Sequence, residues 1–207
     1  LGFCLTISYF LYNNWSQKTK WAMPLMVIFI VGFSIRSIAR NMDWKNNLTL
    51  FSNDYYHSTN SAKLNSSLGF TLLDSYRNLD DKENNKHLIT QAIFHLKKAI
   101  EIYPKYIDCY FLLGNAYYLN KDFKNAVGIY EKYIELNPND NSVMKNYQKA
   151  LREHGRILFF DESNNLAAKN QLLKALKLEP NDDKALELLG AAEAELGYLV
   201  NSLQFLL

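Results

Sequence analysis

The sequence predicts an all-α protein in which an N-terminal transmembrane helix is followed by an α-solenoid of paired helices. Two observations support this fold class. Trp21–Ile35 runs for fifteen residues without a charge, and three similar phrases recur further along the chain: Ile102-Tyr103-Pro104, Leu136-Asn137-Pro138 and Leu178-Glu179-Pro180. Recurrence of this kind indicates a repeat architecture. An unrelated helical bundle is the alternative, but it gives no reason for the phrases to recur.

Residues 1–39 are predicted to form transmembrane helices, of which the first is truncated. A spanning helix needs about 20 largely apolar residues. Lys20 and Arg36 can snorkel from the two ends of the uncharged run, which extends the usable span to Ala39. Leu1–Tyr12 is apolar and is interpreted as the end of a preceding span. Because the chain opens on Leu and closes on Phe-Leu-Leu, we expect a fragment of a longer protein.

Two alternatives compete for this apolar head. It could form a buried helix of a soluble core, or it could be a signal peptide. A signal peptide fits poorly, because the run is followed by Arg36 and Arg40 and not by a small-residue cleavage site. Trp15 and Trp21 lie where an aromatic belt is expected, which favours the membrane.

Residues 40–59 are predicted to be a juxtamembrane linker that contains a docking helix. Asp43 could cap a helix that starts at Trp44, and Trp44, Leu48 and Phe51 would then share one face. Terminal repeats of a solenoid need such a cover over their open apolar face. We therefore expect this helix to cover the first repeat.

The repeat region is predicted over residues 60–207, and its clearest unit is residues 107–140. Tetratricopeptide repeats are helix–turn–helix units of 34 residues with small and large residues at fixed offsets. Counting from Ile107, this sequence fits every offset of that template: Leu113, Gly114, Tyr117, Ala126, Tyr130 and Pro138. Small residues allow two helices to approach closely, so Gly114 and Ala126 are expected to face each other.

The other units are predicted at residues 62–106, 141–182 and, in part, 183–207. The first carries an insertion around Ser75–Lys86, a polar stretch that reads as a solvated loop. The third is eight residues longer than the template, and Arg152–Phe160 is the expected source of extra turns in its first helix. The fourth starts at Asp183 and is expected to stop inside its second helix.

Composition excludes several kinds of chemistry. The 23 basic and 21 acidic residues give a net charge of +2, too balanced for an electrostatic nucleic-acid binder. Two Cys and four His share no metal-ligand spacing, and no nucleotide, serine-hydrolase, zincin or thioredoxin motif occurs. The acidic cluster Asp80, Asp81 and Glu83 lies among Lys and Asn and is interpreted as a solvated loop. We expect no catalytic, cofactor-binding or metal-binding residue in this chain.

The junction between the apolar head and the repeats carries a family resemblance. An apolar span followed by Arg36-x3-Arg40-Asn41-x2-Trp44-x5-Leu50-Phe51, and then by tetratricopeptide repeats, resembles the transmembrane O-mannosyltransferases that target cadherins and their bacterial relatives. The resemblance implies a polytopic membrane glycosyltransferase that uses a polyprenyl-phosphate sugar donor, with its repeats on the exoplasmic side. Its catalytic acidic residues lie in an early loop, so this chain would be the non-catalytic C-terminal region. The heavy use of Asn, Lys, Tyr and Ile indicates a bacterial relative.

Two functions follow. The first is a solenoid that binds protein or peptide partners or substrates of such a glycosyltransferase-like protein, since stacked helix pairs form a concave groove. The alternative is a membrane-anchored scaffold of an envelope or secretion complex, without enzymatic activity. Many further spans and an acidic pair upstream would indicate the first function, and a single span would indicate the second.

Membrane orientation rests on charged residues near the spans. Lys18 and Lys20 favour a cytoplasmic loop before the second span, which would place the repeats in the periplasm or a lumen, as the resemblance implies. Arg36, Arg40 and Lys45 argue the reverse by the same rule. We expect the exoplasmic placement, because spans outside this segment also influence topology.

The predicted peptide groove comes from the repeat register. In this repeat type, positions 2, 5, 9 and 12 of the first helix line the concave face, a property carried over from the repeat family. These positions are Asp108, Phe111, Asn115 and Tyr118 in the second repeat, and Ser142, Lys145, Lys149 and Arg152 in the third. The three bases could hold an acidic peptide or a terminal carboxylate, with Asn115 bonding its backbone. A solvated helix face is the alternative.

The predicted groove partly resembles the carboxylate-clamp repeats that bind chaperone tails. The match is incomplete, because the first repeat has Ser66 and Phe70 where those clamps carry a Lys and an Asn.

Overall fold

A computed structural model describes residue 9 and residues 22–204, and the chain divides into two compact units, residues 1–53 and 54–207. Every element among the described residues is an α-helix. The predictions for Leu1–Tyr12, Trp15, Lys18 and Lys20 fall largely or wholly outside these residues.

The first unit contains helix α2 (Ala22–Asp43). Pro24 lies in its first turn, where the missing backbone N–H has no helical partner to lose. The large apolar side chains from Met26 to Ile38 are all exposed, with exposed fractions between 47 and 69%. Within residues 22–204 no helix combines the length and apolarity that a membrane crossing requires. The predicted transmembrane helix is therefore not confirmed.

Helix α3 (Asn47–His57) differs from the predicted docking helix. It begins at Asn47 because Asn46 forms the cap: the Oδ1 atom of Asn46 accepts from the Thr49 backbone N–H at 2.8 Å. Trp44 lies in the turn before this helix with 66% of its surface exposed. The predicted start at Trp44 was therefore wrong. No residue of α3 is buried, but the ring of Tyr55 near its end lies 4.8 Å from that of His95 in the first predicted repeat, and covering of the first repeat stays a prediction.

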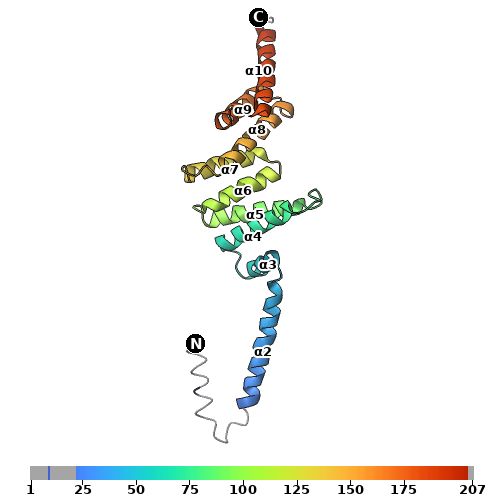
Figure 1. Cartoon of the computed structure of the whole chain (residues 1–207), viewed down its shortest axis with the longest axis vertical. Coiled ribbons are helices and arrows are strands. Elements are labelled where there is room, and N and C mark those ends of the chain that lie inside the picture. Colours follow the sequence, from blue (N-terminus) through green and yellow to red (C-terminus); the bar gives the residue numbers. More distant parts are fainter. Residues whose placement is uncertain (1–8, 10–21, 205–207) are drawn as a thin grey trace. The chain divides into compact units, whose positions relative to one another are not determined.

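The second unit is a stack of antiparallel helix pairs (Figure 1). Its helices are α4 (Ala62–Arg77), α5 (Lys86–Ile102), α6 (Ile107–Leu119), α7 (Phe123–Leu136), α8 (Met144–Phe160), α9 (Asn165–Leu178) and α10 (Asp183–Gln204). Side chains of Ser61, Asp122 and Asn164 cap α4, α7 and α9 by accepting a backbone N–H three residues later. Each pair packs internally and against the next pair, so the core runs continuously along the stack.

One glycine in the first helix of each pair sets the closest approach within that pair. A Cβ atom added to Gly69 would lie 2.6 Å from Cγ of Leu96, and one added to Gly114 would lie 2.6 Å from Cδ1 of Tyr130. The expected partner of Gly114 was Ala126. The ring of Tyr130 instead fills the space over Gly114, while Ala126 is fully buried in the surrounding core.

The third pair repeats this contact at Gly155. A Cβ added there would lie 2.8 Å from Cγ of Leu172. Thirteen residues separate Gly155 from Ala168, close to the twelve between Gly114 and Ala126. Gly155 thus lies in the standard part of the repeat, and the extra residues of α8 precede it. The extra turns were expected within Arg152–Phe160, whereas the packing of Gly155 on Leu172 assigns them to the part of α8 before Gly155.

Helix α10 is continuous over 22 residues. It contains no break at Gly197, because the surrounding Ala, Glu and Leu residues favour helix and no Pro or N-capping turn interrupts them. The expected turn into a second helix of the fourth unit does not occur up to Gln204.

Candidate peptide-binding groove

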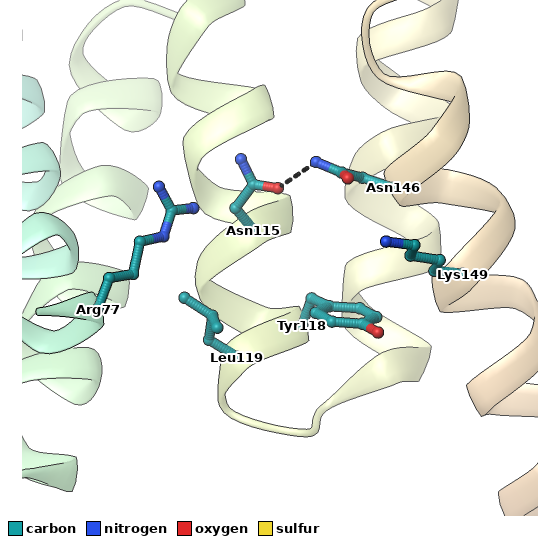
Figure 2. A pocket seen from close by; sticks show the side chains of 6 residues that line it. All are labelled: Arg77, Asn115, Tyr118, Leu119, Asn146 and Lys149. Atoms are coloured by element: carbon teal, nitrogen blue, oxygen red, sulfur yellow. Dashed lines mark hydrogen bonds between the residues drawn. The ribbon is translucent and has the colours of Figure 1, made fainter. Parts of the chain in front are cut away.

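Three successive pairs contribute side chains to a cavity of about 150 Å³. Arg77 comes from the last turn of α4, and α6 and α8 contribute the rest, so the cavity crosses the stack (Figure 2). Its lining consists of Arg77, Asn115, Tyr118, Leu119, Asn146 and Lys149.

Asn115 is at the centre of the cavity and is held in one orientation. Its Oδ1 atom accepts from Nδ2 of Asn146 at 2.9 Å (Figure 2). The same atom accepts from the Tyr130 hydroxyl at 2.8 Å. Burial raises the pKa of Tyr130, so this hydroxyl stays protonated and remains a donor. The Nδ2 group of Asn115 makes no hydrogen bond with any described residue, and it is therefore available to a ligand.

The two charged side chains of the lining are both cationic. Arg77 and Lys149 approach Asn115 from opposite sides in Figure 2. Neither forms an ion pair with another described residue, and no carboxylate lines the cavity. Glu153 does not line the cavity, but its charge adds to the effect of burial in raising the pKa of Tyr118. The cavity therefore offers uncompensated positive charge beside free amide donors.

Arg152, a predicted groove residue, lies elsewhere. Its guanidinium pairs with Asp182 at 2.8 Å and with Glu153 at 3.2 Å, and 17% of its side chain is exposed. Asp182 also accepts from Gln148 and from the backbone N–H of Ala185 at the start of α10. Burial alone raises the pKa of Asp182, but these hydrogen bonds outweigh it and lower the pKa. Arg152 thus ties α8 to α10 and carries no free charge.

The structure brings together three of the eight predicted groove residues: Asn115, Tyr118 and Lys149. Asp108 and Lys145 are exposed and do not line the cavity, and Phe111 is half-buried with its ring 6.0 Å from that of Tyr133.

Sequence reasoning missed Arg77, Leu119 and Asn146. Asn146 follows Asn115 by 31 residues, nearly one repeat, and that spacing is a signal that could have been used. Within the described part of the chain, no group of three or more His, Cys, Asp and Glu could hold a metal ion.

The model of the tetratricopeptide repeat family matches residues 107–140, the segment predicted as the second repeat. Over 228 aligned residues the chain is 24% identical to protein O-mannosyl-transferase TMTC3 of Homo sapiens, and 23% identical to the protein of that name from Mus musculus. Each alignment covers 88% of this chain and 23% of the relative, so the chain spans about a quarter of the relatives' length.

Solved repeat proteins are similar to this chain at a lower level. MamA is 20% identical with a TM-score of 0.46, over 71% of this chain and 75% of that one. YrrB, described as a TPR protein with an unusual peptide-binding site, is 19% identical with a TM-score of 0.43, over 74% of this chain and 70% of that one. The repeat match and the helix pairs show that residues 62–204 form an all-α, tetratricopeptide-like solenoid, as predicted from the sequence.

Proposed function

We propose that the solenoid is a protein-interaction module that binds an acidic segment of a partner polypeptide and anchors one carboxylate in the cavity between α4, α6 and α8. One observation carries the proposal. Two unpaired cations, Arg77 and Lys149, and the free amide N–H of Asn115 converge on the same space. A carboxylate is the group that matches such donors, because charge-assisted hydrogen bonds contribute roughly 1.5–3 kcal/mol each when partly desolvated.

The experiment compares Lys149→Ala with Lys145→Ala. Both residues are lysines on the same helix, but only Lys149 lines the cavity. Binding of fluorescent octapeptides rich in Asp and Glu is measured by anisotropy, with free and amidated C-termini and with Asn/Gln counterparts. Lys149→Ala should weaken binding of the acidic peptides about tenfold or more, while Lys145→Ala should leave it within twofold.

The peptide set also identifies which carboxylate is held. Loss of binding on amidation would assign the cavity to a chain terminus, and loss only in the Asn/Gln series would assign it to an acidic side chain. Equal affinity for acidic and neutral peptides would contradict the proposal.

The wider role that we propose is presentation of partner polypeptides to a membrane mannosyltransferase. The similarity to TMTC3 over 88% of this chain supports it, although the chain corresponds to 23% of that protein. A photo-crosslinking amino acid at Tyr118, in the cavity wall, should capture a partner that carries O-linked mannose. Capture of partners that never carry the sugar would instead favour the envelope or secretion scaffold.

We further propose that α2 attaches the chain to a membrane and that the solenoid is exoplasmic. The exposed apolar side chains from Met26 to Ile38 support attachment. Asn84, in the exposed loop between α4 and α5, is a suitable position for a reporter. In intact cells Asn84→Cys, placed in a chain that also carries Cys4→Ser and Cys109→Ser, should react with a membrane-impermeant thiol reagent, whereas the same chain with Asn84 retained should not. Protection until lysis would place the solenoid on the cytoplasmic side.

A further inference from the structure

A buried tyrosine outside the cavity is bonded to the amide group at its centre. Tyr130 is fully buried and does not line the cavity, and its ring packs over Gly114. Its hydroxyl donates to Oδ1 of Asn115 at 2.8 Å and forms no hydrogen bond with any other described residue. Since a fully buried hydroxyl cannot turn towards solvent, its proton depends on Asn115 for an acceptor.

The contact between Asn115 and Asn146 does not select one orientation of the two amide groups. In the structure Nδ2 of Asn146 donates to Oδ1 of Asn115 at 2.9 Å (Figure 2). If both amide groups turned over, Nδ2 of Asn115 would donate to Oδ1 of Asn146, and one hydrogen bond would replace the other. The terminal torsion of an asparagine side chain is roughly two-fold, so it permits such a turn.

The hydroxyl of Tyr130 makes the two arrangements unequal. After the turn, Nδ2 of Asn115 would face Tyr130, and the hydroxyl could only accept from it. The proton of the hydroxyl would then be buried without an acceptor. A buried donor without a partner is costly enough to make the turned arrangement at least about fivefold rarer than the observed one.

This orientation decides which hydrogen-bonding groups Asn115 presents to a ligand. Arg77 and Lys149 carry donors only, and Nδ2 of Asn115 adds further donors beside them. A carboxylate has acceptor oxygens only and can accept from all three residues. The amide of an Asn or Gln side chain has an NH₂ group as well, which would meet a donor there unless Asn115 turned its Oδ1 towards it.

We infer that Tyr130 is a positioning residue that makes the cavity prefer carboxylates over side-chain amides, because its hydroxyl keeps Oδ1 of Asn115 turned away from the ligand. The inference rests on the proposed function, and it names the residue that determines the specificity of that site. Tyr130 itself touches no ligand and acts through Asn115.

The test compares Tyr130→Phe with Tyr133→Phe in the full chain, purified in mild detergent. Tyr130→Phe removes the hydroxyl but keeps the ring over Gly114. Tyr133 lies on the same helix, is 5% exposed, and donates to Asp140, which does not line the cavity. The measured quantity is the ratio of the affinities for the acidic octapeptide and for its Asn/Gln counterpart.

Tyr130→Phe should lower this ratio by at least about fivefold, chiefly because the neutral peptide gains affinity from the turned amide of Asn115. Tyr133→Phe should leave the ratio nearly unchanged. In an Asn115→Ala background, Tyr130→Phe should also leave the ratio nearly unchanged, since the amide through which it acts is gone. A purely structural role of the hydroxyl would lower the ratio in both backgrounds.

The outcomes separate this inference from the proposed function. If wild type prefers the acidic peptide and Tyr130→Phe keeps the same ratio, the inference is wrong and the proposed function stands. A fall of equal size in the Asn115→Ala background would likewise overturn the inference. Equal binding of the two peptides by wild type would overturn both.

Discussion

Glycine at the closest contact of each pair is the residue on which helix packing depends most directly. Gly114→Ala would bring a Cβ against the Tyr130 ring, which is fully buried and cannot withdraw. Overpacking of this kind costs about 1–3 kcal/mol. We expect chemical denaturation to show that loss for Gly114→Ala.

Gly128→Ala is the matched control for this change. Its added Cβ meets no atom within 4 Å, and alanine is favoured over glycine in a helix by up to about 1 kcal/mol. The free energy of unfolding should therefore stay equal or rise. Similar losses in the two variants would show that Gly114 does not lie in a tight contact.

Lys121 stores backbone strain in the turn between α6 and α7. Its φ is 60°, in the left-handed region that costs an L-residue about 1 kcal/mol or more. Lys121→Gly should raise the free energy of unfolding by about 0.5–1 kcal/mol. The neighbouring Asn120→Gly should bring no gain, because Asn120 has φ of −78°. An equal change in the free energy of unfolding in both variants would show that the backbone of Lys121 is not strained.

His95 links stability to pH. It is 9% exposed and lies 3.0 Å from Asn65, whose amide N–H donates to the carbonyls of Thr59 and Ser61. Burial, and secondarily the charge of Lys98, lowers the pKa of His95 below 6.5. The unfolded chain therefore takes up this proton at a higher pH than the folded chain, and stability falls as pH drops from 6.5 towards the lowered pKa.

His95→Gln should reduce the loss of unfolding free energy between pH 7.5 and 5.5, measured by urea titration at each pH. His154, whose pKa is also lowered by burial, should account for part of the remaining slope. His87→Gln, at an exposed position, is the control and should keep the wild-type slope. If His95→Gln leaves the pH dependence of the unfolding free energy unchanged, His95 does not link stability to pH.

At the scale of elements, the repeat template predicted helices wherever its spacing was kept. Residues 107–140 follow it throughout, and α6 and α7 occupy that segment as two helices joined at Asn120–Asp122. The loop between α4 and α5 was also predictable, because a polar stretch rich in Asn and acids has no apolar face to bury.

The template failed where extra residues had to be assigned to one end of a helix. Both ends of α8 have suitable apolar periodicity, and only the contact of Gly155 with Leu172 shows which turns are extra. The start of α3 was missed for a related reason. Asp43 and Asn46 are both acceptable caps, and the hydrogen bond from Thr49 selects Asn46.

The junction of α8 and α10 is an element-scale prediction. Asp182→Asn removes the charge that pairs with Arg152, which is only 17% exposed, and should cost about 1–3 kcal/mol of unfolding free energy. The adjacent Asp183→Asn changes an exposed acid and should cost less than 0.5 kcal/mol. Equal losses of unfolding free energy in the two variants, measured by denaturation, would contradict a stabilising link between α8 and α10.

At the scale of the whole molecule, the repeat register predicts three of the residues that line the cavity, but it does not predict the cavity as a whole. Register alone predicts which helix face a residue occupies, and on that basis Asn115, Tyr118 and Lys149 were found. Register does not predict which side chains extend from one helix pair to the next. The side chain of Arg77, from the preceding helix pair, lines the cavity. The side chain of Arg152 does not, because it pairs with Asp182 at the start of α10.

Because Arg152 does not line the cavity, it is not a suitable position for testing ligand binding by mutation. Arg152→Ala would disturb the α8–α10 junction as well as any ligand. Arg77 and Lys149 are the informative pair of residues. They come from different repeats, and neither of them forms an ion pair with another residue of the segment 22–204.

The central claim is that these two cations hold one anion between them. The most direct measurement is a double-mutant cycle with Arg77→Ala and Lys149→Ala, in which calorimetry gives the affinity of the acidic octapeptide. Each single variant should lose about tenfold, equivalent to about 1.4 kcal/mol, and the double variant should lose clearly less than the product of the two. Affinity unchanged in both single variants, or losses that multiply fully, would contradict a shared carboxylate site.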